Sequence, residues 1–194
     1  MTTQDTGLRA RLVTAGVELV TREGVHALTL REIARQAGVS HGAPRRHFAT
    51  HVELLAAIAR HGFDELAAAL AAADRTAGED PRARLAAQSR GYLDYAAAHP
   101  GMFELMFRHD LLEGSGTDLR RTTLPLFETF VRLVAAVRPP SGTDPAVVAG
   151  AFWANLHGLA QLRAWGSLRL VTGSDDPGPL LDTALTAHLG PEPR

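Results

Sequence analysis

Apolar residues recur every three or four positions along most of the chain, which is the spacing of amphipathic helices. The first such run contains Leu8, Leu12 and Leu19, and Gly24 then stands where a C-terminal helix cap belongs. β-Branched residues rarely alternate with polar ones, so the pattern predicts an all-α fold. We expect about nine helices, near 8–23, 30–37, 41–47, 51–74, 81–98, 100–108, 118–137, 145–168 and 177–188.

Two kinds of capping signal fix the starts of several of these helices. Thr29 and Thr50 each precede a glutamate by three positions, which is the capping-box spacing. Aspartate followed by proline marks three further starts, because aspartate accepts from free N–H groups and proline at the first helical position loses no hydrogen bond. These pairs are Asp80-Pro81, Asp144-Pro145 and Asp176-Pro177.

The helices expected at 30–37 and 41–47 are short, and Gly38-Val39-Ser40 separates them. Two short helices joined by a glycine-containing turn are typical of a helix-turn-helix, whose second helix enters the major groove of DNA. We expect Ser40 to cap that second helix, which makes Pro44 its fourth residue. The segment is too polar for a core, so its exposed side chains are candidates for DNA contacts.

Composition and charge support this interpretation. The chain has 194 residues, 45% of them hydrophobic, and no cysteine, which excludes disulfides and thiolate metal sites. Residues 1–63 carry eight arginines against five acidic residues, although the whole chain has a net charge of −1. A basic first third suggests that one end meets a polyanion. The N-terminus lacks the apolar segment of a signal sequence, and the apolar run at 66–73 is too short to span a bilayer, so we expect a cytoplasmic protein without membrane contact.

The segment TLREIARQAGVSHGAPRRHFATHVELLAAI, residues 29–58, resembles the DNA-binding region of the TetR family of bacterial transcriptional regulators. The matching positions are Thr29, Ile33, Ala34, Ala37, Gly38, Val39, Ser40, Gly42, His47, Phe48, Thr50 and Leu54. Three positions depart from the family pattern. Pro44 stands in place of leucine, Arg45 in place of tyrosine and His51 in place of lysine, and these changes bear on the operator sequence rather than on the binding mode.

The resemblance implies a set of DNA-binding residues. By position, the candidates for facing bases are Arg31, His41, Gly42, Ala43 and Arg45. The candidates for phosphate contacts are Thr29, Arg46, His47 and His51, and Ser40 belongs to the same surface as the expected cap. Arginine suits both roles, because it binds phosphate and pairs in a bidentate manner with guanine.

The second half of the chain carries a weaker resemblance. FWANLHG at 152–158 and HPGMFELMF at 99–107 are similar to a Trp-His-Gly (WHG) class of C-terminal domain in the same family. The family then implies a DNA-binding domain at 1–50 and a helical ligand-binding and dimerisation domain at 51–190. It also implies a homodimer formed through the last two long helices, which binds a palindromic operator and is released by a small apolar or amphipathic effector.

Large apolar residues and one histidine are candidates for lining the effector pocket. They are Met102, Phe103, Met106, Phe107, Phe127, Phe130, Trp153 and His157. For any single member, an ordinary place in the core is the alternative.

Other functions have less support in the sequence. His41, His47 and His51 straddle a helix break without a nearby carboxylate at ligand spacing, so we expect no metal and no cofactor. We find neither a nucleophile elbow nor a phosphate-binding glycine loop, so we expect no enzyme and assign no catalytic residue. A small helical enzyme and an interaction module that has lost operator binding remain the alternatives to a repressor.

Overall fold

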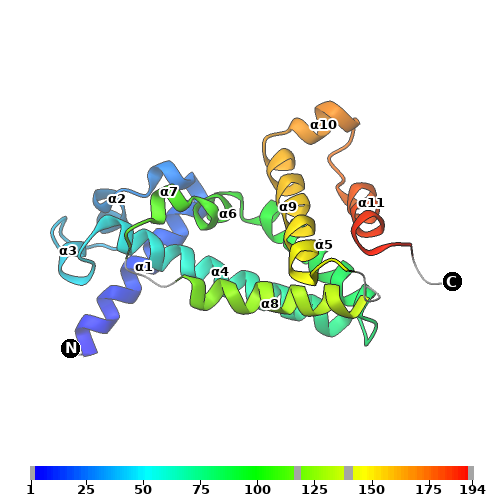
Figure 1. The fold of residues 1–194 in the computed structure, drawn as a ribbon. Coiled ribbons are helices and arrows are strands. Elements are labelled where there is room, and N and C mark those ends of the chain that lie inside the picture. The colour runs from blue at the N-terminus through cyan, green and yellow to red at the C-terminus, as the bar shows by residue number, and fades with distance from the viewer. Residues whose placement is uncertain (1–2, 116–118, 138–141, 192–194) are drawn as a thin grey trace. The chain divides into compact units, whose positions relative to one another are not determined.

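A computed structural model describes residues 3–115, 119–137 and 142–191 of the chain (Figure 1). Within these ranges every regular element is a helix, which confirms the all-α prediction. The elements are α1 (Thr3–Glu23), the short 3₁₀ helix η1 (Val25–Ala27), α2 (Leu30–Gln36), α3 (Pro44–His47), α4 (His51–Thr76), α5 (Pro81–Ala98), α6 (Pro100–Phe107), α7 (His109–Leu112), α8 (Arg120–Val137), α9 (Pro145–Ala164), α10 (Ser167–Thr172) and α11 (Gly178–Leu189).

The chain divides into two compact units. The first consists of Met1–Glu65 and His99–Thr122, and the second of Leu66–Ala98 and Thr123–Arg194. Helices α4 and α8 each begin in the first unit and end in the second. This division follows packing, whereas the functional boundary expected at residue 50 stays a prediction.

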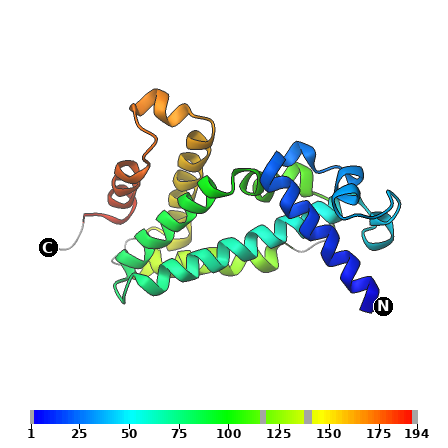
Figure 2. The same ribbon diagram turned by 180° about the vertical axis from the view of Figure 1, so that it is seen from behind.

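Helix α1 is the central element of the first unit. It packs against η1, α2, α3 and α6, and it is the dark blue helix in Figure 2. Leu12 and Leu19 of α1 are fully buried together with Ile33 of α2 and Ile58 of α4. The apolar residues at helical spacing therefore form the core on which the helix-turn-helix is mounted.

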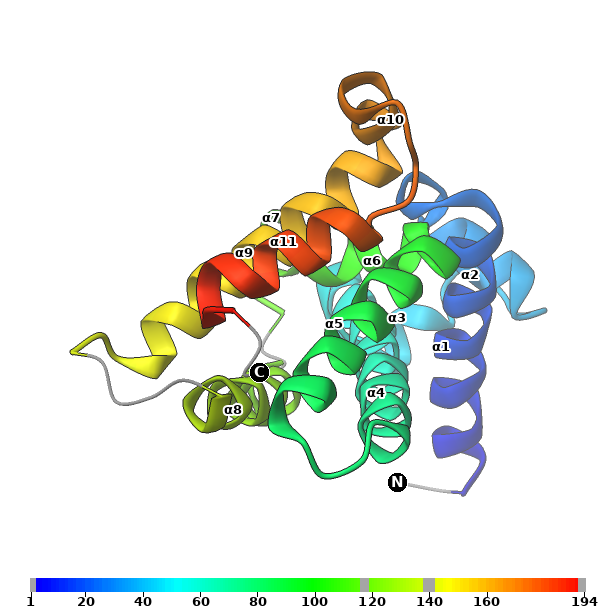
Figure 3. The ribbon, with the colours of Figure 1, turned by 90° about the vertical axis from the view of Figure 1, so that its right-hand side faces the viewer.

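The second unit is built around the contact between α5 and α9. Helix α11 packs on both of them, and Figure 3 shows it lying along α9. Leu85 of α5, Phe152 and Leu156 of α9 and Leu181 of α11 form its buried core. The Phe130 ring of α8 stacks on Phe152 with 5.4 Å between the ring centroids.

The predicted capping signals are confirmed. The Thr29 hydroxyl accepts from the Glu32 N–H at 3.2 Å, and the Thr50 hydroxyl accepts from the Glu53 N–H at 3.1 Å. The three aspartates accept at the starts of α5, α9 and α11: Asp80 from Ala83 at 3.0 Å, Asp144 from Ala146 at 2.9 Å and Asp176 from Gly178 at 2.9 Å.

Most predicted helix ends agree with the structure within a few residues, with one clear exception in the second unit. The helix expected at 145–168 is two helices, because α9 ends at Ala164 and α10 begins at Ser167. Gly166 between them has a φ of 70°, which is left-handed and interrupts the helical hydrogen-bond ladder. Residue 118, the expected start of α8, lies outside the described residues, and the short helices η1 and α7 were not predicted.

Candidate nucleic-acid interface

The segment from α2 to α3 has the geometry of a helix-turn-helix. Helix α2 ends at Gln36 with Ala37 as its C-cap, and Gly38 follows with a φ of 66°, which turns the chain sharply. The Val39 N–H then donates to the Ala34 carbonyl at 3.0 Å and closes the turn. Both helices pack on α1, so one rigid helix supports the whole motif.

The second helix of the motif is shorter than the sequence predicts. Helix α3 begins at Pro44 rather than near His41, and no side-chain cap from Ser40 is present at its start. Proline has no N–H, so an α-helical bond from Pro44 to Ser40 cannot form. Instead the Ala43 N–H donates to the Ser40 carbonyl at 2.9 Å in a turn, and Pro44 becomes the first helical residue.

The burial of Pro44 explains its departure from the family pattern. Pro44 is buried, at the position where the family pattern has leucine. The neighbouring Phe48 is also buried, at 1% exposure. Pro44 therefore keeps an apolar contact at that position while shortening the helix.

The predicted DNA-binding residues lie at the surface of the segment from the Thr29 cap of α2 to the first residue of α4. Exposed members are Thr29, Arg31, Ser40, His41, Gly42, Arg45 and Arg46, and partly exposed members are Ala43, His47 and His51. Because consecutive residues of a helix point about 100° apart, Arg45 and Arg46 face different directions. One arginine can approach the floor of a groove while the other reaches a phosphate.

His51 has a structural role that the sequence did not suggest. Its Nε2 lies 2.6 Å from the Leu28 carbonyl oxygen, so Nε2 carries the proton and donates. This bond joins the first turn of α4 to the residue before the Thr29 cap. Because Nε2 is engaged, only Nδ1 of His51 is available for a phosphate contact, and that contact stays a prediction.

Arg35 and Glu32 on α2 neutralise each other next to the predicted surface. Arg35 forms an ion pair with Glu32, and this hydrogen bond lowers the pKa of the Glu32 carboxyl and raises the pKa of Arg35. The pair is exposed, so its value for stability is small. The positive charge of Arg35 therefore offsets the repulsion that the Glu32 carboxylate would exert on an approaching phosphate.

Two arginines of α1 that contact this motif were not predicted from the sequence. Arg9 donates to the His47 carbonyl at 2.6 Å, and Arg11 donates to the Ala37 carbonyl at 2.7 Å. The partners lie 38 and 26 positions away, so local periodicity and capping carry no signal for them.

The residues predicted to line an effector pocket fall into separate clusters within each unit. In the first unit, a Cβ added at Gly62 would lie 2.6 Å from Met102 and 2.8 Å from Met106, and the Phe103 and Phe107 rings are 4.8 Å apart. Phe130 in the second unit stacks on Phe152, as described above. Met102, Phe103 and Met106 are buried, which is consistent with either a core or a pocket lining. Their assignment to a pocket therefore stays a prediction.

A polar network of the buried Tyr92, the half-buried His157 and the exposed Trp153 joins α5 to α9. The Tyr92 hydroxyl lies 2.9 Å from His157 Nδ1, and the Trp153 indole also hydrogen-bonds this hydroxyl. An indole N–H only donates, so the Tyr92 proton is left to donate to His157, whose Nδ1 accepts. Burial raises the pKa of the Tyr92 phenol and lowers the pKa of the His157 imidazole, so His157 is neutral in this network.

The lowered pKa of His157 predicts a pH-dependent stability. Below about pH 6.5, the ordinary histidine pKa, the unfolded chain takes up a proton at residue 157 that the folded chain does not bind. Stability should therefore fall as the pH falls from 7.5 to 5.5. His157→Gln keeps an acceptor for Tyr92 and removes the titration, so its melting temperature should fall less over that interval than that of the wild type. Equal decreases in the two proteins, measured by circular dichroism, would contradict the assignment.

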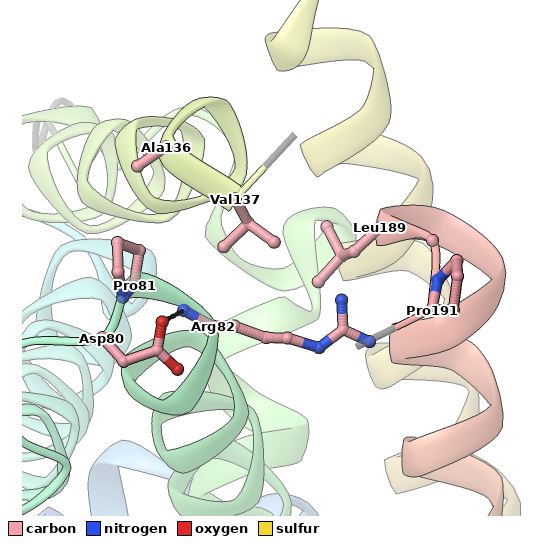
Figure 4. Close-up of a pocket in the computed structure, with 8 residues that line it drawn as sticks. Asp80, Pro81, Arg82, Ala136, Val137, Leu189 and Pro191 are labelled. Carbon is pink, nitrogen blue, oxygen red and sulfur yellow. Dashed lines mark hydrogen bonds between the residues drawn. The ribbon is translucent and has the colours of Figure 1, made fainter. Parts of the chain in front are cut away.

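The second unit also contains an open groove of about 420 Å³ (Figure 4). Its lining residues are Asp80, Pro81, Arg82, Ala136, Val137, Leu189, Gly190 and Pro191. The Arg82 side chain extends across the groove toward Leu189 and Pro191. None of the predicted effector residues lines this groove.

A membrane-spanning helix and a cluster of metal-binding side chains are both absent from the described residues. No helix among them is long and apolar enough to cross a bilayer. No cluster of three or more histidine, aspartate or glutamate side chains among them is arranged to hold a metal ion.

Comparisons with known proteins agree with this geometry. Residues 12–58 match the family described as bacterial regulatory proteins, tetR family. Residues 85–188 match the tetracyclin repressor-like C-terminal domain. The narrower WHG class of C-terminal domain stays a prediction.

Curated relatives match about half of the chain. The transcriptional activator FasR of Mycolicibacterium smegmatis is 32% identical over 102 residues, which are 53% of this chain and 46% of FasR. The chain spans about half the length of the curated relatives it matches.

Several solved structures are similar over nearly the whole chain. A protein of unknown function from Rhodococcus sp. RHA1 is 31% identical with a TM-score of 0.78, covering 94% of this chain and 93% of that one. The multidrug binding protein EbrR, complexed with imidazole, is 26% identical with a TM-score of 0.65, covering 95% and 90%. The second family model alone spans more than half of the residues. The chain therefore belongs to the TetR family of bacterial regulatory proteins.

Proposed function

We propose that this chain is a DNA-binding transcriptional repressor that acts on a palindromic operator. The observation that carries the proposal is the exposed surface of the helix-turn-helix, where Arg31, Arg45 and Arg46 project from a motif fixed on α1. Arginine at the start of a helix that enters the major groove can read guanine or bind phosphate. A regulatory rather than a catalytic role, exerted in the cytoplasm, is part of the proposal.

The proposal includes a homodimer formed through the second unit, because two copies of the helix-turn-helix are needed to bind two half-sites. Helix α9 and the residues after it expose several large apolar side chains, which a partner would cover. They are Val147 at 63%, Leu162 at 40%, Trp165 at 71%, and Leu170 and Val171 at 86% each. A second copy of the chain provides the same recognition surface for the second half of a palindrome.

The proposed effector is a small apolar or amphipathic molecule that binds within the C-terminal part of the chain. It would stabilise a dimer whose recognition helices no longer match two successive major grooves. The structure of EbrR with imidazole supports a small-molecule effector by similarity. The candidate effector residues named from the sequence remain part of this proposal.

A DNA-binding titration tests the proposal. The purified protein is titrated against duplexes from upstream of its own gene and, if none binds, against a library of genomic fragments. We expect a selected duplex, hereafter the operator duplex, to bind far more tightly than a scrambled duplex of equal composition. Its affinity should fall steeply with salt because arginines displace counterions from phosphates.

The mass of the complex and the control duplex complete the test. Native mass spectrometry should find two chains on each operator duplex. If no genomic fragment binds better than the scrambled duplex, repression by operator binding is wrong, and the fold serves as an interaction module.

A further inference from the structure

Helix α3 has little internal support. It contains only four residues, a single turn; at its ends the Arg46 N–H donates to the Ala43 carbonyl at 3.1 Å and the Phe48 N–H to the Pro44 carbonyl at 2.9 Å. A single helical turn is unstable by itself, because few bonds offset the cost of fixing its backbone. The direction of α3 is therefore set by contacts from outside the helix.

Arg9 of α1 supplies two such contacts at the C-terminal end of α3 and a third contact to α4. Its Nη1 donates to the His47 carbonyl at 2.6 Å, which satisfies a carbonyl of the last helical residue. Its guanidinium lies 4.0 Å from the centroid of the Phe48 ring, within cation–π distance. The same Nη1 lies 3.5 Å from Oε1 of Glu53.

Glu53 extends this connection into α4. Its Oε2 accepts from the Ala49 N–H at 2.8 Å, while its own N–H donates to the Thr50 hydroxyl. Arg9 thus joins α1, the end of α3 and the capped start of α4 through one planar cation. A guanidinium suits this role because its donors are held in a fixed fork.

We propose that Arg9 is a positioning residue for operator recognition, which fixes the direction of α3 without contacting DNA itself. The proposal rests on the proposed function, because it concerns how α3 meets bases. Base readout requires donors and acceptors in fixed positions, whereas attraction to phosphates tolerates small rotations. Loss of Arg9 should therefore reduce sequence preference and leave the sequence-independent attraction nearly unchanged.

The test is Arg9→Met, which keeps much of the apolar stem and removes the donors and the charge. Binding is measured by fluorescence anisotropy for the operator duplex and the scrambled duplex at several salt concentrations. We expect the operator affinity to fall about tenfold or more. A tenfold change in affinity is about the cost of losing one hydrogen bond to a charged group. The scrambled duplex should bind within roughly twofold of wild type, with an unchanged slope of affinity against salt.

Arg22→Met is the matched control, because Arg22 lies on the same helix and bonds to Glu23 and Gln36. It should retain the preference for the operator duplex. Arg9→Lys keeps the charge but loses the fork, so its preference should fall between those of wild type and Arg9→Met.

Hydrogen exchange of the free protein gives a readout that does not depend on DNA. In Arg9→Met, peptides that cover residues 41–50 should exchange faster than in wild type, whereas peptides that cover the core of α1 near Leu12 and Leu19 should keep their protection. Protection of that core also shows that the variant is folded.

Two results would overturn the proposal. A salt slope reduced by about 0.9 would mean that Arg9 itself neutralises a phosphate. An unchanged operator preference together with unchanged exchange at 41–50 would mean that α3 is held without Arg9. If wild type selects no duplex, the proposed function fails, and the exchange comparison separately decides whether Arg9 fixes α3.

Discussion

Arg45→Ala is expected to lower the affinity for the operator duplex by roughly 5- to 150-fold and to narrow its advantage over the scrambled duplex. Arg45 is exposed on α3 directly after the buried Pro44, with the small residues Gly42 and Ala43 before it. Small residues let the start of the helix approach the base edges closely. A bidentate contact from arginine to guanine is worth about 1–3 kcal/mol of discrimination, which corresponds to this range.

The neighbouring Arg46 should behave differently, because it points about 100° away around the helix. We assign Arg46 to a phosphate, so Arg46→Ala should weaken binding to both duplexes by similar factors. The slope of log affinity against log salt should become shallower by about 0.9 for each chain. Titrations of both variants against both duplexes at several salt concentrations separate the two roles.

The outcome that contradicts these assignments is well defined. If Arg46→Ala reduces operator preference while Arg45→Ala affects both duplexes equally, the roles are exchanged. If neither variant differs from Arg22→Met, the exposed face of α3 does not meet DNA.

Gly101→Ala is expected to destabilise the first unit by about 2–3 kcal/mol and to lower the melting temperature by roughly 5–10 °C. A Cβ at this position of α6 would lie 2.4 Å from the Val20 carbonyl oxygen and 3.2 Å from the Gly24 Cα. Both atoms belong to the backbone, so no flexible side chain can move aside. The whole of α6 would have to shift away from α1, disrupting a closely packed contact.

Gly7→Ala on α1 is the matched control for this substitution. Its added Cβ meets nothing within 4 Å, so the change should be neutral or stabilise the helix by up to about 1 kcal/mol. Thermal unfolding of the two variants and the wild type, followed by circular dichroism, gives the comparison. Equal melting temperatures for Gly101→Ala and wild type would show that α6 is not seated so closely on α1.

Much of the fold was accessible from the sequence, because the signals were local. Helix periodicity places apolar residues within four positions of each other, and the caps at Thr29, Thr50 and Asp144 act over two or three positions. The motif at 29–58 likewise depends on a fixed local order of residue types. These features predicted the helices, the helix-turn-helix and the family.

The exceptions arise where a local signal competes with backbone or tertiary constraints. Ser40 is a good capping residue, yet the missing N–H of Pro44 moves the start of α3 by three positions from His41. Gly166 continues an apolar pattern in the sequence, but its left-handed backbone divides α9 from α10.

The chain's sequence by itself determined the all-α class, the capped helices and the residue types of the proposed DNA-binding surface. The tertiary structure alone decided that Arg9 holds the end of α3, that His51 bonds to the Leu28 carbonyl and that Tyr92 meets His157. These contacts join positions 38, 23 and 65 residues apart. Such pairings depend on how helices pack, and the spacing of residues along one helix contains no information about its neighbours.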